Sequence, residues 1–154
     1  MMRVAILGSS ISALEYGHKI LDKTSSAQVT VYTEDAEVGF PETSFSEEIV
    51  LSDALHSIPD NWYTSIPTGI DRNSPSRTAA FWLCKAMAIQ LTCRGARFLL
   101  RTRILEIDED RCEISFRGGG LVGSGVDSYD ALSDFRGARA MKPLDGSFRR
   151  TNRE

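Results

Sequence analysis

The spacing of hydrophobic positions near the N-terminus changes twice, which predicts a strand, a helix and a second strand. Residues 3–7 form a short, largely apolar run that ends at Gly-Ser-Ser, typical of a strand buried on both faces and followed by a tight turn. Apolar positions then recur at helical spacing across residues 11–21, and residues 28–33 are rich in β-branched and aromatic side chains. A strand, a helix and a strand within about 30 residues form the βαβ unit of a parallel sheet.

Residues 34–75 lose this periodicity. They are acidic, contain four of the five prolines and carry scattered hydrophobic positions, so we expect a long excursion with one short helix around residues 47–56. An excursion of this length inside a domain usually carries function or contains unrecognised structure.

The clearest helical pattern follows the excursion. Ser74 and Pro75 predict its start, because serine caps helix N-termini and proline suits the first turn. An apolar face then continues until Gly95, which is expected to stop the helix. Its members are Ala80, Cys84, Met87, Ala88 and Leu91.

The rest of the chain predicts extended structure. Residues 96–107 are expected to form one strand and residues 112–116 another, with residues 108–111 as the hairpin turn between them. A glycine-rich loop at residues 118–125 then leads to a weaker strand-like run at residues 129–135.

Composition limits the classes of function. The 154 residues suit one domain, and 42% hydrophobic and 25% charged residues with a net charge of −3 are ordinary for a globular protein and exclude a generally basic nucleic-acid binder. The longest apolar runs fall far short of the roughly 20 residues that cross a bilayer. The first run is also too short for a secretory signal, so a cytoplasmic chain is expected. Residues 141–154, which are rich in arginine, are expected to be a basic, flexible tail.

The cysteines and histidines do not predict a metal site. Three cysteines show no C-x-x-C spacing and the two histidines lie near none of them in sequence, so neither a zinc site nor a disulfide framework is expected. His18 falls on the apolar face of the first helix, where a packed histidine is expected. No catalytic acid or base is identified, and the catalytic residues stay unknown.

The turn after the first strand carries the strongest chemical signal, which is the run Gly8-Ser9-Ser10-Ile11-Ser12-Ala13. Its position and spacing fit the G-x-G-x-x-G/A fingerprint of dinucleotide binding, with Ser10 in the second glycine position and Ala13 in the third. Gly8 suits the tight turn and Ala13 is small enough for close packing. Ser10 places a Cβ where a pyrophosphate approaches, although its hydroxyl can donate to a phosphate. Free amides and the dipole of the first helical turn would complete an anion site.

Dinucleotide sites also use an acidic residue at the end of the second strand to accept the ribose hydroxyls. Glu34 is the candidate here, with Asp35 as the alternative. Two acids after a strand are also typical of a solvated turn. The βαβ unit allows either FAD or NAD(P) as the ligand.

The sequence resembles the FAD-binding domain of flavoprotein oxidoreductases, in particular the para-hydroxybenzoate hydroxylase-like and geranylgeranyl reductase-like groups. Four blocks occur in the family's order over residues 3–140. They are the turn Gly8 to Leu14, the strand at 29–32 with Val38-Gly39 after it, the stretch Arg77, Leu83, Gly95-Ala96 and Thr102-Arg103-Ile104, and the stretch from Asp130 to Gly137-Ala138-Arg139-Ala140.

The resemblance implies an α/β fold: a Rossmann-like, three-layer FAD/NAD(P)-binding domain over residues 1–140, with a parallel sheet and a small antiparallel hairpin or meander. It implies FAD as the cofactor, Arg77 near the phosphates or the flavin edge, and Gly137 where the chain returns to the nucleotide. The family's acidic residue aligns with Thr33, so Glu34 is displaced by one. The later Gly-Asp motif, the substrate domain and the cap over the flavin have no counterpart, so the resemblance is to a truncated member.

Three functions remain open from the sequence. The first is an FAD-binding oxidoreductase domain that acts as a small subunit, as a homo-oligomer or with a partner subunit. The second is an NAD(P)-binding domain. The third is a non-catalytic, truncated flavoprotein fold used for binding or regulation.

Overall fold

A computed structural model of the chain describes residues 1–38, 47–119 and 123–137. Its centre is a parallel sheet of four strands in the order β3-β2-β1-β7. The strands are β1 (Arg3–Leu7), β2 (Gln28–Tyr32), β3 (Arg97–Leu99) and β7 (Ala131–Asp134). The chain adds β2 and β3 on one side of β1 and later returns to pair β7 on the other side. The strand order therefore reverses at β1, which makes the crevice between β1 and β7 a topological switch point.

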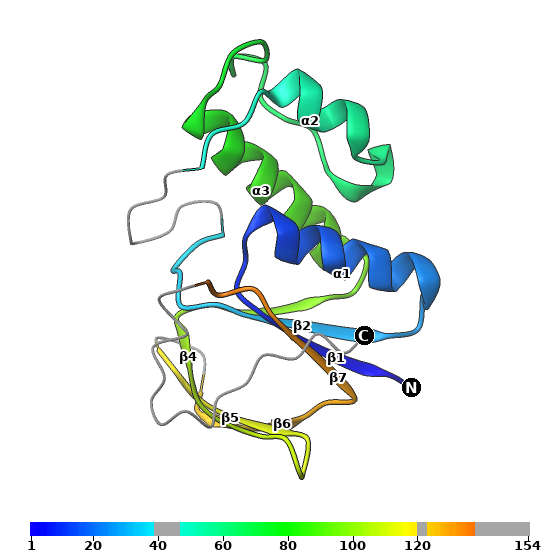
Figure 1. The fold of residues 1–154 in the computed structure, drawn as a ribbon, viewed down its shortest axis with the longest axis vertical. Coiled ribbons are helices and arrows are strands. Elements are labelled where there is room, and N and C mark those ends of the chain that lie inside the picture. Colours follow the sequence, from blue (N-terminus) through cyan, green and yellow to red (C-terminus); the bar gives the residue numbers. More distant parts are fainter. Residues whose placement is uncertain (39–46, 120–122, 138–154) are drawn as a thin grey trace.

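Helices cover one face of this sheet (Figure 1). They are α1 (Ile11–Lys23), α2 (Leu51–Ser57), the 3-10 turn η1 (Asp60–Trp62) and α3 (Arg77–Cys93). α1 and α3 pack closely where Gly17 faces Leu91, since a Cβ at Gly17 would lie 2.9 Å from the Leu91 Cδ2 atom. None of the helices in the described ranges is long and apolar enough to span a membrane.

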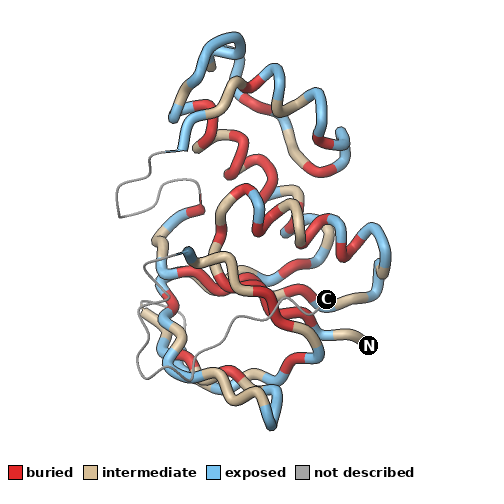
Figure 2. The backbone as a smooth tube through the Cα atoms, in the orientation of Figure 1, coloured by how far each residue is buried: buried red, intermediate tan, exposed pale blue. Residues whose placement is uncertain are grey.

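A small antiparallel sheet covers the opposite face and completes three layers. It is a meander of β4 (Thr102–Asp108), β5 (Glu113–Gly118) and β6 (Gly125–Ser128), in the order β4-β5-β6. Its apolar side chains, including Ile114 and Phe116, meet Ala5, Leu7 and Leu132 from the parallel sheet. Figure 2 shows buried positions along the central strands and on the helices above them. The predicted α/β fold with a parallel sheet and an antiparallel meander is confirmed.

One predicted strand is divided in the structure. The single strand expected at residues 96–107 is wrong, because β3 joins the parallel sheet and β4 joins the antiparallel sheet. Arg101 lies between them in the left-handed region with φ of 50°. This conformation turns the chain out of one sheet and into the other. The hairpin turn expected at residues 108–111 is present, and β6 was not predicted.

The helix boundaries in the middle of the chain also differ from the predicted ones. Ser76, rather than Ser74, caps α3, because its hydroxyl accepts a hydrogen bond from the amide of Ala79 at 3.0 Å. The short helix of the excursion lies at Leu51–Ser57 instead of 47–56. The polar run at the end of the described chain does form β7, which pairs with β1 from Val4↔Ala131 to Leu7↔Asp134.

A buried histidine connects the excursion to the helices. His18 is fully buried, and its Nε2 lies 3.0 Å from the carbonyl of Met87 while Nδ1 lies 2.9 Å from the Arg94 guanidinium. Because Met87 offers only an acceptor and Arg94 only donors, the ring is the neutral tautomer with its proton on Nε2. Arg94 also donates to Asp22, and so does the indole N–H of Trp62, whose ring stacks on His18.

This histidine is expected to make stability depend on pH. Burial lowers the pKa of His18 below its ordinary value, and the charge of Arg94 acts in the same direction, against the hydrogen bond to Met87. The unfolded chain therefore takes up a proton first, at about pH 6.5. The stabilisation is present above that pH and is lost as the pH falls toward the lower pKa of the folded state. Urea unfolding between pH 7.5 and 5.5 should show this loss for the natural chain and for His56→Gln at the exposed second histidine. An equal loss of stability over this pH range in His18→Gln would contradict the assignment of the pH dependence to His18.

Candidate functional site

The turn between β1 and α1 requires glycine at its first position. Gly8 has φ of +103°, and its amide donates to the carbonyl of Tyr32 at 2.8 Å. A Cβ at this position would lie 3.1 Å from the Phe135 carbonyl carbon and 3.3 Å from the amide nitrogen of Arg136. The turn is therefore held between the carboxyl ends of β2 and β7, at the switch point of the sheet.

The first turn of α1 presents free amides at this place. Ser10 is the N-cap, and its hydroxyl accepts from the amide of Ala13 at 3.2 Å. Ala13 is fully buried, while Ser12 is exposed. Among the described residues, no acceptor meets the amides of Ile11 and Ser12. These two donors, with the helix dipole behind them, suit an anion.

Polar side chains from the end of β2 meet the same turn. The Ser9 hydroxyl lies 3.1 Å from the Thr33 hydroxyl and 3.4 Å from a carboxylate oxygen of Asp35. The Thr33 hydroxyl also accepts from the Asp35 amide at 3.2 Å. Glu34 is exposed and points to Arg103, with 3.9 Å between the charged groups. Of the two acids expected near a ribose, the structure thus brings Asp35 to the turn and leaves Glu34 outside it.

A thiol lies directly beneath the turn. Cys84 of α3 donates to the carbonyl of Ser9 at 3.2 Å and is buried. Burial raises the pKa of this thiol to about 12, with further contributions from the charges of Glu47 and Asp35. Because the thiolate is the nucleophile, Cys84 stays an unreactive, packed group at neutral pH.

Alkylation of the folded protein is therefore expected to reach only two of the three cysteines. Cys93 and Cys112 are exposed, whereas Cys84 is buried. Iodoacetamide at pH 8 should give two adducts by intact mass, and a third only after addition of denaturant. A third adduct on the folded chain at the rate of the other two would contradict the placement of Cys84.

An ion pair that the sequence did not predict stands beside Gly8. Arg136 donates to both carboxylate oxygens of Asp134 at 3.0 Å, and its backbone amide donates to the same carboxylate at 2.9 Å. The Asp134 side chain is only 2% exposed and that of Arg136 18%. The next residue, Gly137, has φ of +86°, and a Cβ there would meet nothing within 4 Å. The two residues are only two positions apart, but the polar run in which they lie gave no indication that Asp134 would be buried.

Arg77 lies away from these residues. It is exposed at the start of α3, seven residues before Cys84, which corresponds to about 10 Å along the helix axis. Gly39 and the run from Ala138 to Ala140 fall outside the described residues, as does the basic tail at 141–154. Within the described ranges, no group of three or more histidine, cysteine or acidic side chains is placed to hold a metal ion.

Comparison with solved structures identifies the fold. The chain superimposes on a water-forming NADH oxidase from Lactobacillus brevis, solved with NADH bound, with a TM-score of 0.53, 22% identity, 87% of this chain and 24% of the oxidase covered. THI4 from Thermovibrio ammonificans gives a TM-score of 0.54 at 15% identity, over 86% of this chain and 55% of that one. A geranylgeranyl bacteriochlorophyll reductase-like protein from Thermoplasma acidophilum gives 0.55 at 11% identity, over 87% and 40%.

These likenesses show that the chain has a Rossmann-like, three-layer α/β fold. No protein-family model matches the sequence, and no curated protein matches it either. The chain spans about a quarter of the NADH oxidase and about half of THI4.

Proposed function

We propose that this chain is the dinucleotide-binding domain of an oxidoreductase and that its ligand is FAD, bound with the pyrophosphate at the turn formed by residues 8–13. The observation that carries the proposal is the glycine turn at the switch point. Gly8 fits against the backbone of Phe135 and Arg136, and the free amides of Ile11 and Ser12 lie at the same turn. In open α/β sheets, ligands bind in this crevice at the carboxyl ends of the strands.

Different residues around the turn would contact different parts of the ligand. Ile11 and Ser12 donate their amides to the pyrophosphate, and the Ser9 and Ser10 hydroxyls flank it. Asp35, held beside Ser9 and Thr33, takes the place of the acid that accepts ribose hydroxyls. Glu34 and Arg77 lie further out and would contact the ligand only at its periphery, whereas Gly137 follows Arg136 beside Gly8, where the chain would return to the ligand. FAD, when bound, supplies the electron transfer, and the protein contributes position and electrostatics.

Two other functions receive support from particular features. An NAD(P)-binding domain would use the same turn, and the NADH oxidase was solved with NADH bound. A non-catalytic fold used for binding or regulation is favoured by Ser10, whose Cβ occupies the place where a second glycine would admit the pyrophosphate.

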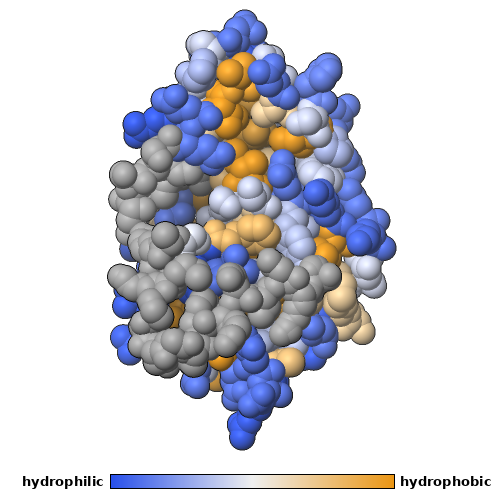
Figure 3. All heavy atoms as spheres, viewed as in Figure 1, coloured by the Kyte–Doolittle hydropathy of each residue, from blue (hydrophilic) through white to orange (hydrophobic). Residues whose placement is uncertain are grey.

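We expect the chain to act in the cytoplasm, together with a second copy of itself or with a partner subunit. Apolar surface is available for association: Figure 3 shows hydrophobic side chains gathered near α2 and α3. A groove of ≈330 Å³ runs along α3, lined by Pro67, Trp82 and Ile89, and Ile89 is 46% exposed.

The test is a visible absorption spectrum of the purified chain before and after incubation with FAD and removal of the excess. A flavin band that stays with the protein supports the proposal. A colourless, folded protein that binds NADH or NADPH saturably selects the nicotinamide alternative. Absence of binding to all three, alone and with candidate partners, would leave the non-catalytic fold.

Ser10→Gly is expected to tighten dinucleotide binding, because it removes the Cβ from the path of the pyrophosphate. Glycine is a tolerated N-cap, so the free energy of unfolding should fall by only about 0.3 kcal/mol. We expect a roughly tenfold lower Kd for FAD, equivalent to about 1.4 kcal/mol. Ser76→Gly, which removes the equivalent N-cap hydroxyl from α3, is the matched control. Equal affinities for Ser10→Gly and the natural chain would show that Ser10 does not obstruct the ligand.

A further inference from the structure

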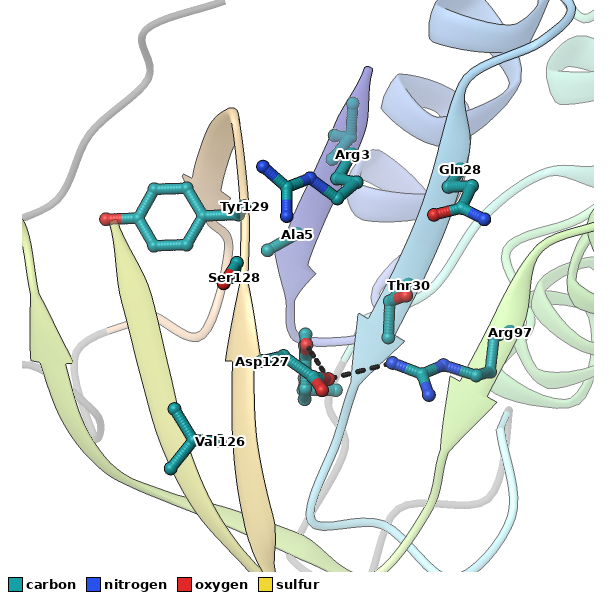
Figure 4. Close-up of a pocket in the computed structure, with 11 residues that line it drawn as sticks. Arg3, Ala5, Gln28, Thr30, Arg97, Val126, Asp127, Ser128 and Tyr129 are labelled. Atoms are coloured by element: carbon teal, nitrogen blue, oxygen red, sulfur yellow. Dashed lines mark hydrogen bonds and ion pairs between the residues drawn. The ribbon is translucent and has the colours of Figure 1, made fainter. Parts of the chain in front are cut away.

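A polar cavity lies on the other side of the parallel sheet from the helices. Its volume is ≈230 Å³, and its walls come from β1, β2, β3 and β6 together with Tyr129 (Figure 4). It opens at the amino ends of the parallel strands, where Arg3 and Gln28 begin β1 and β2. Gly8 is five residues from Arg3, which corresponds to roughly 16 Å along an extended strand. The cavity is therefore separate from the turn that is proposed to bind a dinucleotide.

The strand register explains why polar groups gather here. Arg3 pairs with Gln28, and Thr30 pairs with Ala5 on one side and Arg97 on the other. Paired residues, and residues two apart, share one face of a sheet. Arg3, Gln28, Thr30 and Arg97 consequently all face β6, as Figure 4 shows.

Asp127 on β6 fixes the orientation of Arg97. One Asp127 oxygen accepts from the Tyr32 hydroxyl at 2.6 Å and from Arg97 Nη2 at 2.8 Å. Burial, followed by the hydrogen bond to Asp127, raises the pKa of Tyr32, so the phenol remains a donor. Arg97 is thereby held at one end of its guanidinium group, by Asp127 and beside the Tyr32 hydroxyl.

The two arginines differ in how much donor capacity they retain. The Arg3 guanidinium donates two hydrogen bonds to the Asp130 carboxylate, both 3.1 Å long, and the Arg3 backbone amide donates a third at 2.7 Å. Arg97 donates to Asp127 and also interacts with the Tyr32 hydroxyl, so at least three of its five N–H groups are not used among the described residues. The side chains of Gln28 and Thr30 likewise have no hydrogen-bond partner there. The cavity thus offers several donors, and its one acidic side chain, Asp127, is already engaged.

We propose that this cavity binds a small oxyanion, a carboxylate or a phosphate group, held by the free edge of Arg97 and the hydroxyl of Thr30 with the amide of Gln28 beside them. Planar N–H groups of arginine match two oxygens of either group. The volume corresponds to about seven or eight water molecules, which suits a small metabolite and excludes a dinucleotide. Since the Arg97 side chain is 56% exposed, binding in the millimolar range is expected.

The test is a titration of the ¹⁵N-labelled full chain, observed by amide NMR spectra. Sodium phosphate and sodium acetate are added in separate series, with sodium chloride at matched ionic strength as the reference. We expect saturable shifts of the amides of Thr30, Arg97 and Asp127 with at least one of the two anions, which also identifies the preferred group. Added FAD should not displace that anion, because its site is elsewhere.

Two variants separate the site from general effects of charge. Arg97→Lys keeps a cation beside Asp127 but loses the fork, and Thr30→Val keeps the shape of the side chain but loses its hydroxyl. We expect at least fivefold and about threefold weaker binding, respectively, with folded spectra. Arg103→Lys, at an arginine that is 70% exposed beside Glu34, should leave the midpoint unchanged. Shifts that do not saturate, that chloride reproduces, or that persist unchanged in both variants would overturn the proposal.

Discussion

Gly8→Ala is expected to lower the free energy of unfolding by about 2–4 kcal/mol and to abolish dinucleotide binding. Two costs combine at this position. A φ of +103° strains any residue with a Cβ, and this Cβ would press on backbone atoms of Phe135 and Arg136 at 3.1–3.3 Å. Neither neighbour can rotate away, because Phe135 donates its amide to the carbonyl of Leu7 at 2.7 Å.

Gly95→Ala is the matched control for this variant. Gly95 has nearly the same φ, +105°, but nothing lies within 4 Å of a Cβ there. Backbone strain alone should cost about 1–2 kcal/mol. Urea unfolding of both variants then isolates the contact with β7. Equal losses would mean that the turn is free to move away from Phe135, and retained FAD binding by a folded Gly8→Ala protein would remove the turn as the binding site.

Trp62→Ala is expected to cost about 3–5 kcal/mol and to release the excursion from the helices. Trp62 is 6% exposed, its ring stacks on His18, and its N–H donates to Asp22 at 2.9 Å. Truncation would open a cavity beside His18 and remove one of the partners of Asp22. The segment from Leu51 to Ile66 would then lose its largest buried side chain.

Trp62→Phe separates the two contributions of this residue. Phenylalanine keeps most of the stacking surface but cannot donate to Asp22, so the loss should be about 1–2 kcal/mol. Limited proteolysis should cut the Trp62→Ala protein within the excursion and spare the helices α1 and α3. Cleavage at the same rate in the natural chain and in Trp62→Ala would show that other contacts anchor the segment.

Local hydrophobic patterns were sufficient to predict the elements whose burial follows that pattern. β1, α1 and β2 follow from the apolar run, the helical spacing and the β-branched strand, and the glycine turn follows from its place between them. β6 was missed because Gly125–Ser128 contains one apolar side chain in four residues, and that residue, Val126, is 58% exposed. The division at Arg101 was missed because a left-handed arginine leaves no mark in the hydrophobic pattern.

The site was harder to predict than the fold because it depends on contacts between distant segments. Sequence placed Glu34 and Asp35 together, but only the course of the chain after β2 directs Asp35 to Ser9 and Glu34 to Arg103. The contact of Gly8 with Phe135 joins two segments that no local pattern relates. The same holds for the network that joins His18, Asp22, Trp62 and Arg94.

The pairing of β1 with β7 imposes an order on folding. Arg3 and Asp130, which clamp these strands together, are 127 residues apart in sequence. During synthesis, β1, α1 and β2 can therefore assemble long before the residues that close the turn around Gly8 have left the ribosome. The turn around Gly8 is enclosed only after β7 has paired with β1, and a ligand that bound this turn would stabilise only chains in which that pairing is in place.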